Sequence, residues 1–209
     1  GWNTKDDDHI WDIRQTAGMV FQNPDNQLVA ALVEDDVAFG PENLGVESGE
    51  IARRVDEVLH AVGMEDCRKK ASHQLSGGQK QRIAVAGVIA MNPKCVIFDE
   101  PTAMLDPQGR KEIMDLIHTL HEAGRTIILI THFMEEAADA DRIIMMNDGE
   151  IILEGTPVEV FAHPAKIKQA GLDVPVAVEL AERLRGKGWR IPQDVITSEQ
   201  LVDFVCQYK

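Results

Sequence analysis

The sequence predicts an α/β fold built on a parallel sheet. Two apolar runs, 95–98 and 126–130, have the length and composition of buried strands, and the first is expected to be buried on both faces. Each run ends in polar side chains, and the carboxyl ends of parallel strands are where open α/β sheets bind their ligands. A largely buried helix is predicted at 80–91, and another helix begins near residue 108. Helices and strands therefore alternate along the middle of the chain.

A serine and two glycines stand directly before the helix predicted at 80–91. Ser76 is a natural N-cap for that helix. Gly77 and Gly78 have no side chain to keep a ligand away, and the unpaired amides of a first helical turn suit a phosphate. With Gln79 they form a predicted anion-binding segment, although an isolated Gly-rich helix start would be merely structural.

Two carboxylates end the strand at 95–98. Asp99 lies at the carboxyl edge of a parallel strand, where an aspartate can hold the magnesium ion that bridges nucleotide phosphates. Glu100 projects to the opposite side of the strand end and could act as a general base toward a water, an effect worth roughly 10² to 10⁴ in rate. The bland alternative is an acidic pair that opens a solvated loop.

Three further polar residues stand at strand ends or turns. His132 follows the strand at 126–130, where it could hydrogen-bond a γ-phosphate or an attacking water. Gln22 closes a short apolar strand at 19–21 and would be unremarkable alone. Asp106 lies on the turn before the second helix and, taken by itself, is only a helix cap.

The order of these motifs resembles the ATP-binding subunit of an ABC transporter. Segment 75–79 is similar to the family signature, 96–100 to the Walker B strand with its adjoining glutamate, and 103–106 to the D-loop. Gln22 matches the Q-loop glutamine and His132 the switch histidine. The fold implied is a P-loop NTPase core with a parallel sheet and a helical signature sub-domain.

The resemblance implies a head-to-tail dimer in which each ATP lies between one subunit's phosphate cradle and the other's signature segment. The signature segment of this chain would contact the γ-phosphate held by its partner. Glu100 and His132 would be catalytic at the chain's own site, together with Gln22. The implied cofactors are ATP and Mg²⁺, with Asp99 and Gln22 at the metal and Asp106 among the nucleotide-binding residues.

Residues 20–27 and 34–41 resemble the energy-coupling-factor importers, which take up vitamins or cobalt and nickel ions. This implies three partners: a second ABC ATPase subunit, identical or not, a transmembrane coupling subunit, and a membrane protein that captures the substrate. The expected location is the cytoplasmic face of the cell membrane. Ala103 and Phe133 depart from the family, where many relatives have Ser and Asp, but neither position carries the chemistry.

One family motif is absent, because no G-x-x-x-x-G-K-S/T phosphate cradle occurs in the 209 residues. We therefore expect a C-terminal piece of an ATPase whose sheet lacks the P-loop strand and whose antiparallel sub-domain is missing. The alternative is a non-catalytic partner that contributes only its signature face to a complete ATPase in a heterodimer. Intact Asp99, Glu100 and His132 favour the catalytic interpretation, since a scaffold needs none of them.

Composition restricts the partners. The net charge of −14 disfavours non-specific nucleic-acid binding, so no nucleic-acid partner is expected. No apolar run approaches the roughly 18 residues of a transmembrane helix, so membrane attachment would come through partner subunits. The 3 cysteines show no C-x-x-C spacing and fit a reducing compartment.

We expect two parts in the chain. Residues 1–156 would form the partial ATPase domain, with the helical sub-domain at about 24–90 and an amphipathic helix at 51–62. Residues 157–209 would form a helical extension. It resembles the dimerisation extension of these importers, and the alternative is a packed tail.

Local signals predict further elements near the two ends of the chain. Asp6 to Gln15 are predicted to form one helix, with acidic residues at its positive end. Asn-Asp-Gly at 147–149, between two apolar runs, predicts a β-hairpin. The extension carries a predicted helix at 175–185 and a capping box at 197–200 that opens a final helix.

Overall fold

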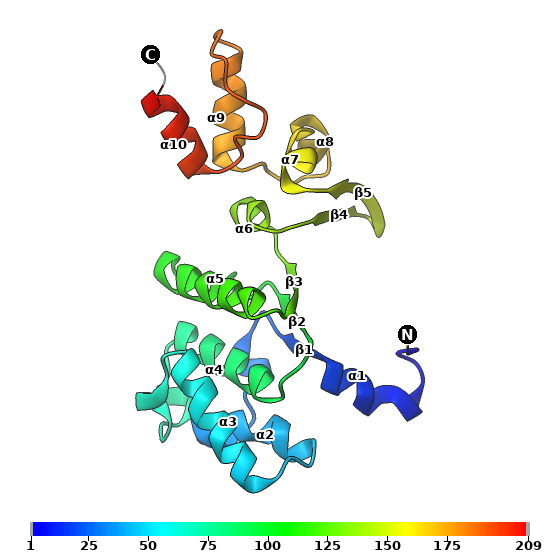
Figure 1. The fold of residues 1–209 in the computed structure, drawn as a ribbon, viewed down its shortest axis with the longest axis vertical. Helices are drawn as coiled ribbons and strands as arrows, with labels where there is room; N and C mark the ends of the chain where they lie inside the picture. Colours follow the sequence, from blue (N-terminus) through cyan, green and yellow to red (C-terminus); the bar gives the residue numbers. More distant parts are fainter. Residues whose placement is uncertain (1, 208–209) are drawn as a thin grey trace. The chain divides into compact units, whose positions relative to one another are not determined.

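The computed structural model describes residues 2–207, which divide into two compact units that we treat separately (Figure 1). Unit 1 is Gly1–Ile130 and unit 2 is Thr131–Lys209. The helices of unit 1 are α1 (Ile10–Thr16), α2 (Val33–Asn43), α3 (Ser48–Ala61), α4 (Gly77–Ala90) and α5 (Pro107–Glu122). Its strands are β1 (Ala17–Val20), β2 (Cys95–Asp99) and β3 (Thr126–Ile130). Short 3-10 turns lie at Asp7–His9, Pro24–Asn26, Glu65–Cys67 and Ser72–Gln74.

The three strands of unit 1 form one parallel sheet in the order β1-β2-β3. Val20 pairs with Phe98 across β1 and β2, and Asp99 pairs with Ile130 across β2 and β3. The predicted parallel sheet is therefore confirmed, and the polar residues that follow β1 and β2 belong to one edge of it.

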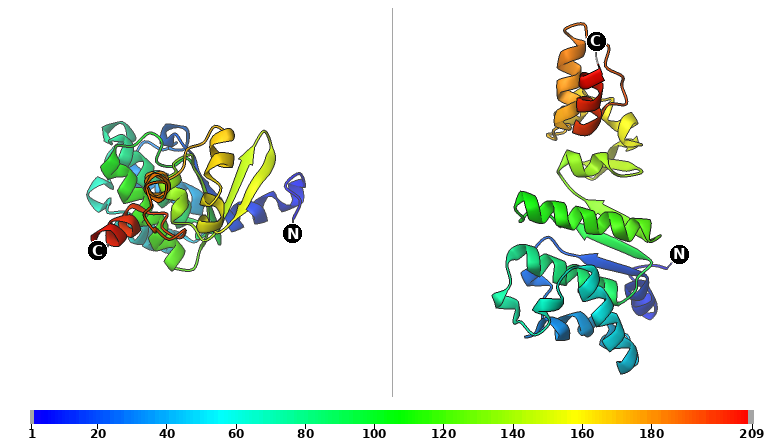
Figure 2. Two further views of the ribbon diagram at one scale, coloured as in Figure 1. Left: turned by 90° about the horizontal axis from the view of Figure 1, so that it is seen from above. Right: turned by 60° about the vertical axis from the view of Figure 1, so that its left-hand side comes forward.

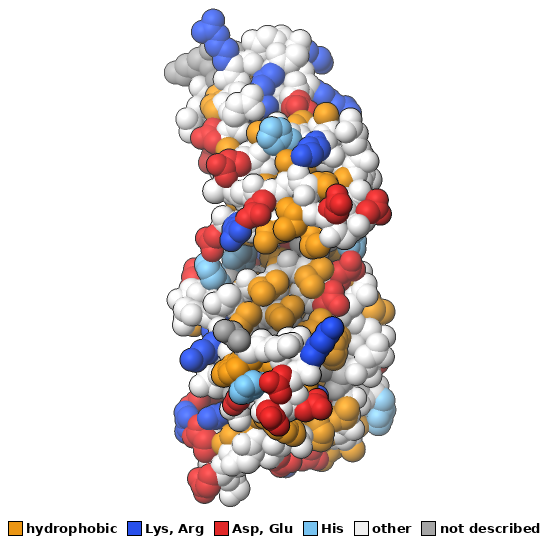
Figure 3. All heavy atoms as spheres, turned by 90° about the vertical axis from the view of Figure 1, so that its right-hand side faces the viewer, with side chains coloured by type: hydrophobic (Ala, Val, Ile, Leu, Met, Phe, Trp, Pro, Cys, Tyr) orange, Lys and Arg blue, Asp and Glu red, His pale blue; other side chains and the backbone are white. Residues whose placement is uncertain are grey.

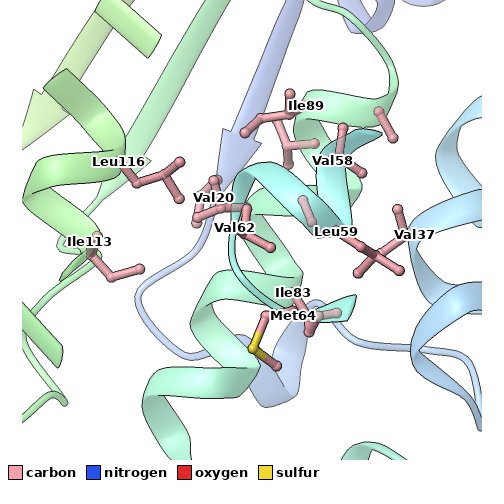
Figure 4. Close-up of a cluster of buried hydrophobic side chains, with 14 of the residues drawn as sticks. Val20, Val37, Val58, Leu59, Val62, Met64, Ile83, Ile89, Ile113 and Leu116 are labelled. Atoms are coloured by element: carbon pink, nitrogen blue, oxygen red, sulfur yellow. The ribbon is translucent and has the colours of Figure 1, made fainter. Parts of the chain in front are cut away.

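One face of this sheet carries the main core. Val20, Val96 and Phe98 point to this face and are fully buried. They belong to one hydrophobic cluster with Ile83 of α4 and Ile113 of α5, part of which Figure 4 shows. The long connections through α4 and α5 therefore cover the same face of the sheet, as right-handed crossovers between neighbouring parallel strands require.

The other face of the sheet is open in unit 1. Met19, Ile97 and Ile128 lie side by side in one register row across the three strands. Met19 is 38% exposed and Ile128 is 47% exposed. The prediction of a buried strand at 126–130 is therefore wrong for this chain, and the strand at 95–98, which was predicted to be buried on both faces, is only half-buried on this one. The physical reason is that α4 and α5 cover one face only. Figure 3 shows a face of the molecule on which exposed hydrophobic side chains gather.

The helices α2, α3 and α4 pack together beyond the sheet. Arg68, in the loop after α3, donates a 2.7 Å hydrogen bond to Glu34 of α2 and pairs with Asp56 of α3. Lys69 also pairs with Glu34. The hydrogen bonds from Arg68 and Lys69 hold the pKa of the Glu34 carboxyl below its usual range. These ion pairs fasten α2, α3 and the loop into one helical group, which Figure 2 shows from the side.

Unit 2 contains the helices α6 (Met134–Ala138), α7 (Pro157–Phe161), α8 (Pro164–Gln169), α9 (Val176–Arg185) and α10 (Ser198–Gln207). Its strands β4 (Ile143–Asn147) and β5 (Glu150–Gly155) form the predicted antiparallel hairpin. Asp148 and Gly149 have φ of 49° and 82°, as a tight hairpin turn requires. The predicted capping box is confirmed: the Thr197 amide donates to Gln200 Oε1 at 3.0 Å, and the Gln200 amide donates to Thr197 Oγ1 at 3.3 Å.

Several predicted helix boundaries differ from the structure. The helix predicted at 80–91 is α4, which spans Gly77–Ala90. The predicted N-terminal helix is split into the 3-10 turn Asp7–His9 and α1, because Asp6 caps the Asp8 amide and starts a tighter turn first. α3 begins at Ser48, ahead of the predicted start at residue 51. Among residues 2–207, no helix combines the length and the apolar character that crossing a membrane requires.

Candidate nucleotide site

The carboxyl edge of the sheet brings Gln22 and Glu100 together. Gln22 follows β1 and Glu100 follows β2, and these strands are neighbours in the sheet. The Gln22 side chain donates a 2.8 Å hydrogen bond from Nε2 to Glu100 Oε2. Two residues that are far apart in the sequence therefore contact each other at this edge of the sheet.

Glu100 has an unusual backbone conformation. Its φ is 46°, in the left-handed region, and its amide donates a 2.9 Å hydrogen bond to the Ile130 carbonyl of β3. A non-glycine residue in such a conformation costs on the order of 1 to 3 kcal/mol and persists where the surrounding structure fixes it. Here the β3 carbonyl and the buried Pro101 and Thr102 that follow fix it.

Asp99 is the last residue of β2 and is half-buried. Its carboxylate and the amide oxygen of Gln22 are the hard oxygen ligands that Mg²⁺ prefers. Because Gln22 uses Nε2 to reach Glu100, Oε1 is the atom of its amide that can ligate a metal. Within residues 2–207, no group of three or more His, Cys, Asp or Glu side chains could hold a metal ion. An ion at Asp99 would therefore need oxygen ligands from outside this set.

The signature segment caps α4 as predicted. The Gln79 amide donates to Ser76 Oγ at 3.3 Å, and the Ser76 amide donates to Gln79 Oε1 at 3.0 Å. This reciprocal pair is a capping box, and it satisfies two amides at the start of the helix. The Gln79 side chain is thus engaged in its own helix start, and its contact with a γ-phosphate stays a prediction.

The two glycines of the segment have open space around them. A Cβ added at Gly77 or Gly78 would meet nothing within 4 Å, and neither residue has a positive φ. Glycine in a helix costs roughly 0.5 to 1 kcal/mol relative to alanine. No neighbouring atom of the described chain therefore requires glycine at either position, and the contact of both glycines with a phosphate stays a prediction.

Asp106 forms the N-cap of α5. Its carboxylate accepts a 2.7 Å hydrogen bond from the Gly109 amide, and the residue is exposed. This bond is the capping role that the sequence alone assigned to it. The contact of Asp106 with a nucleotide stays a prediction.

His132 belongs to unit 2, whereas Asp99 and Glu100 belong to unit 1. Its ring lies 4.2 Å from the ring of Phe133, measured between centroids. The neighbouring Thr131 donates a 2.7 Å hydrogen bond to Glu136, which is buried, and accepts one from the Phe133 amide. These hydrogen bonds hold the backbone on both sides of His132 in one conformation. The predicted hydrogen bond of His132 to a γ-phosphate or an attacking water stays a prediction.

A set of polar contacts between the Q-loop and α4 is not predicted by the sequence pattern. Gln27 accepts a 3.1 Å hydrogen bond from the Phe21 amide, and Gln81 of α4 donates one of 3.3 Å to the Phe21 carbonyl. Lys80 of α4 pairs with Asp25 at 2.6 Å. A glutamine within the apolar helix predicted at 80–91 was the signal that could have revealed this contact.

Comparison with known proteins identifies relatives of this chain. A family model described as ABC transporter matches residues 2–103. The energy-coupling factor transporter ATP-binding protein EcfA1 of Caldanaerobacter subterraneus subsp. tengcongensis is 59% identical over 206 residues, which are 98% of this chain and 74% of that protein. The protein of the same name from Clostridium novyi is 59% identical over 210 residues, which are 100% of this chain and 75% of that protein.

Solved structures of similar chains are known as well. The structure of cbiO1 from Clostridium perfringens, described as part of the ABC transporter complex cbiONQ, has a TM-score of 0.71 and 44% identity. The match covers 85% of this chain and 71% of that one. A dimeric ATP-binding cassette in a post-hydrolysis state, bound to ADP and Pi, has a TM-score of 0.64 and 32% identity over 73% of this chain and 68% of that one.

The fold, the order of the motifs and these relatives define the class as an ATP-binding cassette with a P-loop NTPase fold. The chain belongs to the ABC transporter family, whose ATPase domains bind ATP. Within that family, the relatives described above are energy-coupling factor transporter ATP-binding proteins. The resemblance stated from the sequence is thereby confirmed.

Proposed function

We propose that this chain belongs to the ATPase that powers an energy-coupling-factor importer of a vitamin or of cobalt or nickel ions. The observation that carries the proposal is the hydrogen bond between Gln22 and Glu100, because it joins the residue expected to sense water and metal to the residue expected to act as the base. A non-catalytic partner would have no use for this contact or for the strained backbone of Glu100.

The proposed reaction is hydrolysis of the terminal phosphoanhydride of ATP. Glu100 accepts a proton from the attacking water, whose oxygen bonds to the γ-phosphorus as the bond to the bridging oxygen breaks. Gln22 holds the Glu100 carboxylate by the 2.8 Å hydrogen bond and so fixes the direction from which the base approaches the water. His132 would donate a hydrogen bond to the γ-phosphate.

The oxygen ligands at the sheet edge fit a magnesium ion. Asp99 and Oε1 of Gln22 would hold Mg²⁺, which neutralises charge on the β- and γ-phosphates when it is bound. The remaining ligands would come from the phosphates and from water, as is usual for this ion. This agrees with the lack of a three-residue cluster among residues 2–207.

The proposed assembly is a head-to-tail dimer of ATPase subunits. Gly77 and Gly78 would admit the γ-phosphate held by the partner subunit, which accounts for the open space around both glycines. Ser76, Gln79 and Asp106 would complete this face. Two ATPase subunits together with a transmembrane coupling subunit and a substrate-capturing membrane protein would form the importer at the cytoplasmic face of the membrane.

We assign residues 1–156 to the ATPase domain and 157–209 to an extension that takes part in dimerisation. α9 and α10 of the extension carry apolar side chains on their surfaces. Val176 of α9 is 65% exposed, and Val202 of α10 is 59% exposed. A second extension packed against these helices would remove the apolar area from water.

Titration with magnesium-ATP tests the proposal. The 209-residue chain is compared by calorimetry with the extended chain, by which we mean this sequence extended upstream in its genomic reading frame. We expect ATP binding and hydrolysis by the extended chain and no tight binding by the 209-residue chain, which has no phosphate cradle. Tight binding by the shorter chain would overturn the assignment of the cradle to an upstream segment. Absence of hydrolysis by an extended chain that binds ATP would contradict the proposed activity.

A further inference from the structure

The peptide groups of Phe21 are held on both sides by glutamine side chains. The Phe21 amide donates a 3.1 Å hydrogen bond to Gln27 Oε1, and the Phe21 carbonyl accepts a 3.3 Å hydrogen bond from Gln81 Nε2. Phe21 stands between the end of β1 and Gln22. The two glutamines therefore fix the backbone from which the Gln22 side chain extends toward Glu100.

Both glutamines connect this backbone to α4. Gln81 is part of α4, and Gln27 donates a 2.8 Å hydrogen bond from Nε2 to the carbonyl of Ala84 in the same helix. The side-chain amide of Gln27 thus links the two elements: Oε1 accepts from the Phe21 amide, and Nε2 donates to α4. The ion pair of Lys80 with Asp25 adds a third link between α4 and the loop.

Burial explains why these contacts are specific. Gln81 is only 1% exposed and lies on a helix whose other buried residues are apolar alanines, valines and isoleucines. A buried amide must find hydrogen-bond partners, because leaving it unpaired costs more than an apolar side chain of the same shape. A leucine or methionine would fill the same volume, so the amide at this position is explained by its hydrogen bond to the Phe21 carbonyl.

We infer that Gln27 and Gln81 are positioning residues that couple the signature helix α4 to Gln22, an inference that rests on the proposed function. α4 begins at the segment proposed to contact the nucleotide of the partner subunit. Gln22 serves the nucleotide of the chain's own site. A shift of α4 caused by the partner's γ-phosphate is transmitted through Gln27 and Gln81 to the Phe21 peptide groups, and so to the contact between Gln22 and Glu100.

A double-mutant cycle in the extended chain, assembled with its ATPase partner, tests the coupling. The variant Gln81→Met keeps the side-chain length and removes the donor to Phe21. We expect kcat for ATP hydrolysis to fall about tenfold while KM for ATP changes less than about twofold, because the signature segment itself is unaltered. In a Gln22→Ala background the same substitution is expected to lower kcat less than about twofold further, because its effect passes through Gln22.

A second position and a control separate this effect from a loss of folding. Gln27→Met removes both hydrogen bonds of a residue that is only half-buried. If Gln81→Met fails to fold, Gln27→Met takes its place in the double-mutant cycle with Gln22→Ala. Gln15→Met changes an exposed glutamine of α1, away from the proposed site, and is expected to leave kcat unchanged. Circular dichroism melting shows which variants are folded.

Each outcome decides one point. An equal loss of kcat with and without Gln22 would overturn the coupling, and so would an unchanged kcat for folded Gln27→Met and Gln81→Met. Failure of the unsubstituted extended chain to hydrolyse ATP would instead reject the proposed function. The two failures are therefore distinguishable.

Discussion

The side chain of Gln22 lies 2.8 Å from Glu100, joined by a hydrogen bond that spans the carboxyl ends of two neighbouring parallel strands. The bond gives the Glu100 carboxylate a fixed neighbour. Because Glu100 also adopts a left-handed backbone conformation, both its main chain and its side chain are held in place. A carboxylate held in this way suits a base that must meet one water molecule from one direction.

Replacing this carboxylate should separate binding from hydrolysis. In the extended chain, Glu100→Gln is expected to keep ATP-dependent dimerisation and to lose roughly 10² to 10⁴ in turnover, because the amide cannot accept a proton from water. Dimerisation is measured by size-exclusion chromatography with light scattering, and turnover by phosphate release. Glu122→Gln, at the exposed end of α5, is the matched control. Unchanged turnover in Glu100→Gln would refute the assigned role.

The open space at Gly78 predicts opposite effects on stability and on assembly. Gly78→Ala should stabilise the 209-residue chain by up to about 1 kcal/mol, because Gly78 is helical and no atom lies within 4 Å of an added Cβ. In the extended chain the same methyl should weaken ATP-dependent dimerisation. Stability is measured by urea unfolding and dimerisation by light scattering.

Gly45→Ala serves as the control for this prediction. Gly45 has a φ of 71°, so the substitution should destabilise the chain although it also has open space. Undiminished dimerisation of the Gly78→Ala variant would show that the space is not used by a partner.

The ion pairs of α3 predict a pH dependence of stability. Glu50 accepts hydrogen bonds of 2.7 Å from Arg53 and from Arg54, and they lower its pKa from an ordinary value of 4.5 to about 2. A carboxyl whose pKa falls on folding stabilises the folded state above its unfolded pKa, and this contribution is lost as the pH falls through the folded value. Glu50→Gln should therefore lower Tm above pH 4.5, and the difference from the wild type should shrink toward pH 2.

Thermal melting followed by circular dichroism between pH 2 and pH 7 checks this prediction in the 209-residue chain, with Glu47→Gln as an exposed neighbouring control. The difference in Tm should be small for the control throughout. A difference for Glu50→Gln that stays constant over the whole range would show that the ion pairs do not carry it.

Because one face of the sheet is open, we expect a charged substitution on that face to lower the free energy of unfolding more in the extended chain than in the 209-residue chain. Ile128→Lys should change the stability of the 209-residue chain by no more than about 0.5 kcal/mol, since Ile128 is exposed there. In the extended chain it should cost roughly 3 to 5 kcal/mol, as an unpaired charge does when it is buried. Urea unfolding measures both values. Equal costs in the two chains would mean that the upstream segment does not cover this face.

The positions of the strands and of the motifs could be predicted because they depend on local sequence. Apolar runs located the strands, and the polar residues that follow them located the edge of the sheet. The contact between Phe21 and Gln81 could not be predicted in this way, because it joins residues 60 positions apart through a tertiary hydrogen bond. The backbone conformation of Glu100 was equally hidden, since glutamate has no intrinsic preference for a positive φ.

The burial of the strands was predicted only in part, and the reason is physical. A continuous apolar run such as 126–130 indicates that both faces are covered in the folded protein, but it does not say which segment covers them. In this chain Val20 and Phe98 meet α4 and α5, whereas Met19 and Ile128 meet no such layer. The apolar side chains of this second row are typical of residues that another layer covers, and no segment of the described residues forms that layer.

The strand β3, which carries Ile128 of this apolar row, pairs only with β2 among the described strands. Its other edge is therefore unpaired in the described residues. A strand with one unpaired edge can add the same edge of another copy, and exposed isoleucines favour this association. The 209-residue chain should consequently show an apparent stability and solubility that vary with its own concentration. Dilution series are therefore as informative for this molecule as titrations with nucleotide.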